Sequence, residues 1–185
     1  LMIPKAKQLC GGRHFGQPDF ADRVLALLAD CDHPAELLEL EITEHSAIRQ
    51  REVGIRAMGR LTDAGVSIAL DDFGTAYSSL ANLTAFPLRT AKIDSSFIAQ
   101  LDSEVASRPL VAGMVELIHS VGLQCVAEGV ETQSQADFLR ATGCDVVQGF
   151  RYAPPLTTIQ NGKCCRKTFH KSVVRTGPHR PTILY

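Results

Sequence analysis

The chain has 185 residues, of which 45% are hydrophobic and 21% are charged, and its formal net charge is −1. This length allows one domain or little more, and the composition excludes a chain that is disordered throughout. The sequence contains no apolar run long enough to span a membrane and no pattern typical of a secretory signal. We therefore expect a cytoplasmic protein, or the cytoplasmic module of a membrane-anchored parent, with no membrane contact in this segment.

The net charge is the sum of three different compositions. Residues 1–14 and residues 157–185 contain basic residues but no acid, whereas residues 15–156 contain all 20 acidic residues. We expect residues 15–156 to form the folded domain, residues 1–14 to lie outside its pattern, and residues 157–185 to be a disordered or non-native basic tail. The near-neutral total argues against a nucleic-acid polymer as the partner.

The cysteines do not form a recognisable framework. The chain contains six of them, with no CxxC spacing and no Cys/His cluster of the kind that binds zinc. Without an export signal we expect reduced thiols. Cys125 and Cys144 are expected to be small core residues.

The first predicted element is a helix that Asp19 can cap. A strand follows at Leu37–Thr43, and then a helix that Ser46 can cap and Gly65 ends. The second strand is predicted at Val66–Leu70.

The third strand is predicted at Arg89–Ile93. Pro109 suits the first turn of the next helix, which Gly122 ends. The chain then continues with a strand at Leu123–Ala127, a helix from about Ser134 to Thr142 and a strand at Asp145–Val147.

Strands that alternate with helices at this spacing indicate parallel βαβ units and an α/β fold. The strands are nearly continuous apolar runs, as is typical of a sheet that is covered on both faces. A (β/α)₈ barrel takes roughly 250 residues, or about 30 for each unit. Residues 15–156 therefore hold about five units, and the periodicity alone leaves open an incomplete barrel and a doubly wound sheet.

Polar residues follow the predicted strands at the points where the strands end. They are Glu41, Asp71, Asp72, Lys92, Asp94, Glu128 and Gln148. The carboxyl ends of parallel strands lie on one face, so we expect these side chains to share one space. Oxygen ligands without Cys or His select hard cations such as Mg²⁺ or Mn²⁺. Two such ions would suit phosphodiester hydrolysis, with Lys92 neutralising charge on the phosphate or the nucleophile.

Five segments of the sequence, in this order, resemble the EAL-domain cyclic di-GMP phosphodiesterases. They are LEITE at 40–44, DDFGTAYSSL at 71–80, KID at 92–94, AEGVET at 127–132 and QGF at 148–150. The resemblance extends over residues 15–156. It implies a modified TIM-type barrel, incomplete here with about five βα units, that hydrolyses one phosphodiester of cyclic di-GMP to give pGpG. The family uses Mg²⁺ or Mn²⁺, with two ions in the complete site.

The resemblance also implies a role for each matching residue. Glu41, Asp71 and Asp72 would be metal ligands. Lys92 near the catalytic water and Glu128, as a general base or metal-linked carboxylate, would be catalytic. The residues that would bind substrate or support the site are Gln148, Glu44, Glu131 and Asp94. Glu44 would hold the DDFG loop. Cyclic di-GMP would be the partner, and the family also allows a homodimer.

The sequence departs from the family pattern at two places that concern the metal. It contains no Glu-Ala-Leu motif, and the position of a metal-binding asparagine falls on Leu9 when Phe15–Phe20 is aligned. We therefore expect a truncated chain that is weakly active or inactive. One alternative is a degenerate EAL domain that binds cyclic di-GMP or docks a partner without catalysis. Another is an unrelated Mg²⁺-dependent barrel enzyme that acts on a carboxylate substrate.

Overall fold

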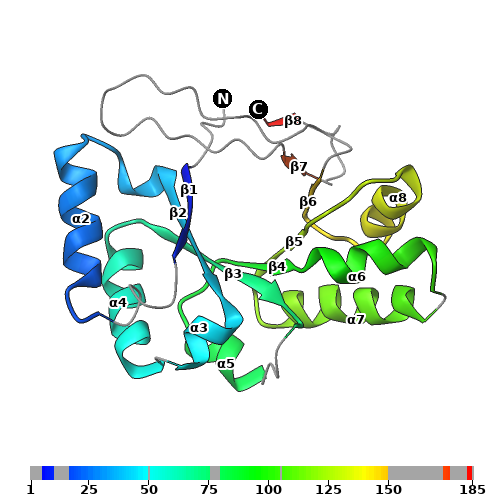
Figure 1. Cartoon of the computed structure of the whole chain (residues 1–185), viewed down its shortest axis with the longest axis horizontal. Coiled ribbons are helices and arrows are strands. Elements are labelled where there is room, and N and C mark those ends of the chain that lie inside the picture. The colour runs from blue at the N-terminus through cyan, green and yellow to red at the C-terminus, as the bar shows by residue number, and fades with distance from the viewer. Residues whose placement is uncertain are drawn as a thin grey trace. The chain divides into compact units, whose positions relative to one another are not determined.

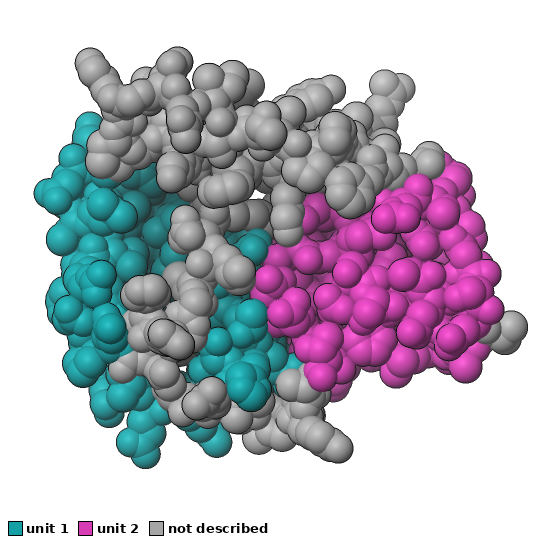
Figure 2. All heavy atoms as spheres, in the orientation of Figure 1, with its two compact units in different colours: residues 1–70, 78–89, 157–169 teal, residues 71–77, 90–156, 170–185 magenta. Residues whose placement is uncertain are grey.

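A computed structural model describes residues 6–10, 17–49, 51–75, 80–104, 106–149, 173–175 and 183–184. The chain divides into two compact units (Figure 2). The first unit comprises residues 1–70, 78–89 and 157–169, and the second comprises residues 71–77, 90–156 and 170–185. The strand at Ser67–Phe73 contributes to both units, because the boundary falls after Leu70.

The first unit contains two parallel strands, the start of a third, and helices that follow them. Its elements are β1 (Ala6–Cys10), α2 (Phe20–Asp30), the 3₁₀ helix η1 (Ala35–Leu37), β2 (Leu38–Thr43), α3 (Glu44–Arg49), α4 (Arg51–Asp63), the first residues of β3 (Ser67–Phe73) and α5 (Leu80–Ala85). β1 pairs with β2 in parallel, and this register sets Leu9 opposite Glu41. Helices α2 and α4 lie side by side (Figure 1).

Helix α4 forms because its apolar residues recur on one face. Met58 and Leu61 have no exposed surface, whereas Arg60 on the outer face pairs with Asp22 of α2. The hydrogen bond from Arg60 lowers the pKa of Asp22, although both side chains are more than half exposed. Gly65 ends this segment at a φ of +99°, a conformation that favours glycine.

The second unit contains the end of β3 and the remaining strands. Its other elements are β4 (Thr90–Ile93), α6 (Ser95–Ala99), the 3₁₀ helix η2 (Gln100–Asp102), α7 (Ser107–Ser120), β5 (Gln124–Ala127), α8 (Gln133–Ala141), β6 (Val146–Gln148), β7 (Val173–Arg175) and β8 (Ile183–Leu184). β4, β5 and β6 are parallel neighbours, whereas β7 pairs antiparallel with β6 and β8 pairs antiparallel with β7.

Helix α7 supplies much of the core of this unit. Val111, Val115 and Ile118 recur at helical spacing and have no exposed surface. The helix packs on β5 and α6 (Figure 1). Burial of three such side chains contributes about 1.5–3 kcal/mol each to the free energy of folding. α7 is also the longest described helix, with 14 residues, and no described helix is long and apolar enough to cross a membrane.

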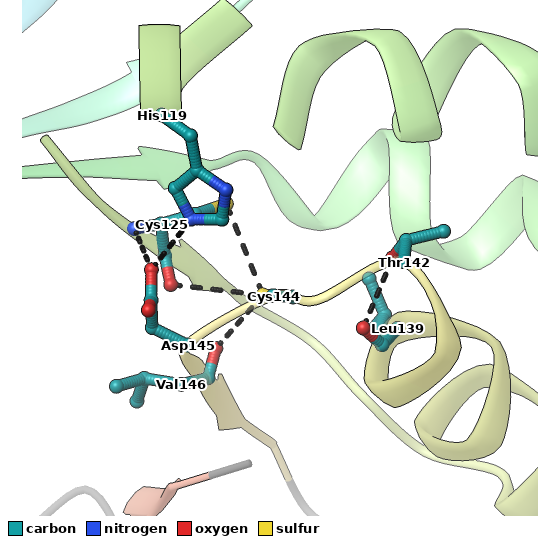
Figure 3. A network of polar contacts seen from close by, with 7 residues as sticks. All are labelled: His119, Cys125, Leu139, Thr142, Cys144, Asp145 and Val146. Atoms are coloured by element: carbon teal, nitrogen blue, oxygen red, sulfur yellow. Dashed lines mark hydrogen bonds and ion pairs between the residues drawn. The ribbon is translucent and has the colours of Figure 1, made fainter. Parts of the chain in front are cut away.

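A polar network joins α7, β5 and the start of β6 (Figure 3). Asp145 Oδ2 accepts the main-chain N–H of Cys125 at 2.8 Å and lies 2.8 Å from His119 Nε2. The Cys144 thiol donates to the carbonyl oxygen of Val146 at 3.3 Å. The side-chain hydrogen bond with Cys144, together with burial, raises the pKa of Cys125. Cys125 and Cys144 are buried free thiols in the core, as the sequence predicts.

The structure agrees with the predicted fold class. All five predicted strands are present, as β2 to β6, and they alternate with helices. The strands follow chain order within each unit, so neither unit closes a barrel by itself among its described residues. Three short strands, β1, β7 and β8, lie in terminal segments where the sequence showed no strand period. Most of residues 157–185 and of residues 1–14 lies outside the described residues.

Three local predictions were wrong. Asp19 is at the N-cap position of α2, but its side chain makes no capping hydrogen bond. Ser46 does not begin a helix, because α3 already begins at Glu44 and the Thr43 hydroxyl accepts the N–H of Ser46 at 3.4 Å. Thr43, a residue type that often caps helices, caps α3 one turn before Ser46. The expectation of reduced thiols is wrong for Cys31, which is disulfide-bonded.

Candidate active site

Lys92 is the centre of a charged cluster in the second unit. It lies in β4 and has no exposed surface, yet its Nζ is 2.7 Å from Asp71 Oδ1 and 2.7 Å from Glu128 Oε1. Asp71 is near the end of β3, and Glu128 directly follows β5. Three neighbouring segments thus bring one ammonium group and two carboxylates together, as the strand-end pattern predicts. A buried ammonium group is tolerated only with such partners.

Asp72 lies in a turn whose left-handed backbone conformation is accessible to aspartate. Its φ is +57°, and the Thr75 N–H and hydroxyl both donate to its main-chain oxygen. Aspartate is one of the few residues that adopt this left-handed conformation readily. Burial and the charges of Asp71, Asp94 and Glu128 raise the pKa of Asp72, while Lys92 opposes them.

Asp94 serves local structure. Its Oδ1 accepts the N–H of Ser96 at 3.0 Å and caps α6, which begins at Ser95. Burial raises the pKa of Asp94, but the hydrogen bonds from Ser96 and Ser95 outweigh it, and the pKa lies below its usual value. The carboxylate of Asp94 therefore stays charged and adds to the negative field around Asp72.

Gln148 completes the cluster from the end of β6. Its Nε2 donates to Glu128 Oε1 at 3.3 Å, and the residue is only 5% exposed. Its Oε1 is buried without a hydrogen-bond partner in the described part of the chain. A buried amide oxygen of this kind can accept a hydrogen bond from a water molecule or from a ligand.

The loop that carries Glu128 packs very closely on its neighbours. Val130 donates its N–H to the Gln148 main-chain oxygen at 3.0 Å, and a Cβ on Gly149 would lie 2.2 Å from the Val130 oxygen. Gly129 adopts a φ of +71°, where a Cβ would lie 2.6 Å from that of Ser95. Only glycine fits at these two positions, so the loop is fixed against both β6 and α6.

Of the nine residues singled out from the sequence, the structure joins four by direct contacts: Asp71, Lys92, Glu128 and Gln148. Asp72 and Asp94 lie in the same electrostatic field. Glu131 is exposed, and its main-chain N–H donates to Gln135 Oε1.

Glu41 and Glu44 belong to the first unit. Glu41 lies in β2 and Glu44 begins α3, and both are buried. In the described part of the chain, no three Asp, Glu, His or Cys residues are arranged to hold a metal ion. The donor set nevertheless suits a hard cation, since the crowded carboxylates around Asp72 are oxygen ligands whose mutual repulsion a cation relieves.

Sequence reasoning missed Gln135. This residue is 4% exposed, and both ends of its side-chain amide are bonded to main-chain groups. It stands three residues after Thr132, which is the spacing of a capping box, and α8 begins with that motif. The spacing of Thr132 and Gln135 in the sequence could therefore have identified this capping residue.

Residues 9–155 match the EAL domain family. The chain belongs to the EAL domain family. The match begins earlier than residue 15, at a position within β1, and ends close to the predicted boundary.

Two relatives illustrate the similarity. This EAL domain is 37% identical over 147 residues to the cyclic di-GMP phosphodiesterase NbdA of Pseudomonas aeruginosa. The aligned residues make up 80% of this chain and 19% of NbdA. It is 35% identical over 148 residues to the signaling protein YkoW of Bacillus subtilis. The aligned residues make up 80% of this chain and 18% of YkoW. The chain thus spans about a fifth of the length of these relatives.

Solved structures agree with the fold. The EAL domain superposes on the PaMucR phosphodiesterase in complex with c-di-GMP with a TM-score of 0.79 and 34% identity, over 83% of this chain and 62% of that one. A Klebsiella pneumoniae BlrP1 complex with calcium and cy-diGMP gives a TM-score of 0.71 and 28% identity, over 80% of this chain and 37% of that one. The TIM-type α/β fold predicted from the sequence is therefore confirmed.

Proposed function

We propose that this EAL domain acts on cyclic di-GMP by the chemistry of its family, hydrolysis of one phosphodiester to give linear pGpG. The observation that carries the proposal is the contact of the buried Lys92 ammonium with Asp71 and Glu128. Relatives named or crystallised as cyclic di-GMP phosphodiesterases support the choice of substrate.

Glu128 has the geometry of a general base. Lys92 and Gln148 both donate to its Oε1, which fixes the carboxylate, and it remains partly exposed. A fixed carboxylate beside solvent can take a proton from water as that water attacks phosphorus. The Lys92 ammonium stabilises the negative charge that develops on the attacking oxygen or on the phosphoryl group.

The oxygen-rich cluster suits a divalent cation, and we propose Mg²⁺ or Mn²⁺. Asp71 and Asp72 are the residues of the second unit that would hold it, and the role of Glu41 as a metal ligand stays a prediction from the family resemblance. A bound cation would lower the pKa of a water molecule and neutralise phosphate charge. The Klebsiella pneumoniae BlrP1 structure is a calcium/cy-diGMP complex, and this supports the choice of a divalent cation.

One observation favours a non-catalytic binding module instead. The β1–β2 register sets Leu9 opposite Glu41, and leucine has no atom that ligates a metal. If the predicted alignment of Leu9 with a metal-binding asparagine holds, the cation site has one ligand fewer. The chain would then be weakly active, or would bind cyclic di-GMP or dock a partner without turnover.

The decisive experiment measures turnover and binding in parallel. The chain is incubated with cyclic di-GMP and Mg²⁺ or Mn²⁺, and pGpG is quantified by chromatography, while calorimetry in Ca²⁺ reports binding. Glu128→Gln should abolish turnover, whereas Glu116→Gln on the exposed face of α7 should not change it. Binding without pGpG formation supports the binding module. Absence of both binding and pGpG formation contradicts both functions.

Location and assembly complete the proposal. A second-messenger hydrolase acts where its messenger is found, so we propose a cytoplasmic location, as a free protein or as a cytoplasmic module of a membrane-anchored parent. A homodimer stays a prediction, and sedimentation of the purified chain tests it.

A further inference from the structure

The loop at residues 128–131 is bonded to one buried side chain, that of Gln135 in the first turn of α8. Gln135 Oε1 accepts the N–H of Glu131 at 2.8 Å and the N–H of Thr132 at 3.0 Å. Its Nε2 donates to the carbonyl oxygen of Ile98 in α6 at 3.2 Å. The residue is 4% exposed, so water cannot replace these bonds without opening the structure.

These bonds join segments on both sides of the charged cluster. Ile98 lies in α6, which begins directly after Asp94 and therefore continues the strand that carries Lys92. Glu131 lies three residues after Glu128, whose own N–H donates to the Ile93 oxygen at 3.2 Å. The amide of Gln135 thus ties the far end of the loop to α6, while the Glu128 N–H ties its near end to β4.

Capping of α8 explains only part of this arrangement. A capping box needs the bond between the Thr132 hydroxyl and the Gln135 N–H, at 3.2 Å here, and the reciprocal bond from the Thr132 N–H. The bonds to Glu131 and Ile98 lie outside α8 and add nothing to its first turn. They serve the loop.

We propose that Gln135 is a positioning residue that holds Glu128 in place against Lys92. It acts through the loop and does not touch the charged cluster. Only an amide of this length combines an oxygen that accepts two N–H groups with a nitrogen that donates to a third group. The inference rests on the proposed function, because it treats Glu128 as the general base. It deepens that function by naming the residue that positions this base.

Three variants separate the parts of the proposal. Gln135→Leu removes all three side-chain bonds at nearly the same volume. Gln135→Glu keeps the accepting oxygen and the capping box but loses the donor to Ile98. Gln133→Leu is the matched control, because Gln133 is in the same helix turn, is exposed, and donates to Asp137.

Amide hydrogen exchange tests the hydrogen bonds themselves. Gln135→Leu should raise the exchange rates of the Glu131 and Thr132 amides by about tenfold or more, since each loses a hydrogen bond. Gln135→Glu should retain their protection, and Gln133→Leu should leave it unchanged. Unaltered exchange in a folded Gln135→Leu protein would overturn the proposal.

The NMR signal of the buried Lys92 ammonium group tests positioning, which a purely structural cap would not affect. It should shift or broaden in Gln135→Leu and in Gln135→Glu, because both release the loop from α6, and stay unchanged in Gln133→Leu. A Lys92 signal that is unchanged in both Gln135 variants would also overturn the proposal. If Gln135→Leu fails to fold, Gln135→Glu decides through the same signal.

Turnover provides the link to catalysis. Where pGpG formation is measurable, kcat should fall about tenfold in Gln135→Leu with KM unchanged, because a misplaced base affects the chemical step alone. Absence of turnover in the unaltered chain would contradict the proposed function, while the exchange rates and the Lys92 signal would still decide the role of Gln135.

Discussion

The Nζ atom of Lys92 lies 2.7 Å from Oδ1 of Asp71, although the lysine side chain has no exposed surface. An ammonium group in this position is stable only while carboxylates surround it. The pair therefore makes the cluster part of the fold of the second unit as well as part of its chemistry.

Lys92→Met should destabilise the protein by about 3–5 kcal/mol, because it leaves Asp71 and Glu128 close together without their shared cation. Urea unfolding at pH 7 measures the loss. Arg60→Met is the control, since it breaks an exposed ion pair with Asp22 and should change the midpoint little. Equal effects of the two substitutions would show that burial of Lys92 is unimportant.

Asp72→Asn should stabilise the metal-free protein at neutral pH. Burial and the charges of Asp71, Asp94 and Glu128 raise the pKa of Asp72 above its usual value of 3.8, so the folded state holds this proton more tightly than the unfolded state. Stability is therefore lost as pH rises from 3.8 through the raised pKa. Asparagine removes that loss and tolerates the φ of +57°.

Urea midpoints in the presence of a chelator measure this pH dependence. The advantage of Asp72→Asn should be full above the raised pKa and should vanish below pH 3.8. An advantage that persisted unchanged into acid would mean that the charge of Asp72 is not its source.

Gly149→Ala should destabilise the protein by at least about 1–3 kcal/mol, because its Cβ would lie 2.2 Å from the Val130 oxygen. Gly113→Ala is the opposite case. It lies within α7 with no heavy atom within 4 Å of the added Cβ, and should stabilise by about 0.5–1 kcal/mol. Thermal unfolding of both variants provides the test. Midpoints that shift in the same direction for the two variants would contradict the close approach of Gly149 to Val130.

Asp145→Ala should cost about 1–3 kcal/mol, because it leaves the N–H of the buried Cys125 without its acceptor. His119→Gln removes only the other partner of Asp145, which is exposed on the surface, and should cost less than about 1 kcal/mol. Urea midpoints rank the two losses. A larger loss for His119→Gln would assign the stabilising role to the ion pair.

Much of the fold was predictable because the strands are short apolar runs between helical patterns. Val66–Leu70 and Leu123–Ala127 lie in or next to β3 and β5 for this reason. The meeting of Asp71, Lys92 and Glu128 followed from the rule that parallel strands end on one face. These features depend on local pattern and on topology, which a sequence carries directly.

Other features depend on partners that are distant in the chain. β1 has the sequence AKQLC, which has no clear strand period, and it is a strand because β2 offers it main-chain bonds. The bond from Gln135 to Ile98 joins residues 37 positions apart, so no local pattern predicts it. The close approach of Val130 to Gly149 is likewise visible only in the folded chain.

The capping box of α8 has a consequence for how the second unit opens. Thr132 and Gln135 begin the helix, and the same Gln135 oxygen bonds the Glu131 N–H. Fraying of the helix at this end also breaks the bonds from Gln135 to Glu131 and Ile98, so unwinding of the first turn releases the loop. Local unfolding of this turn therefore exposes the main-chain amides of both segments together.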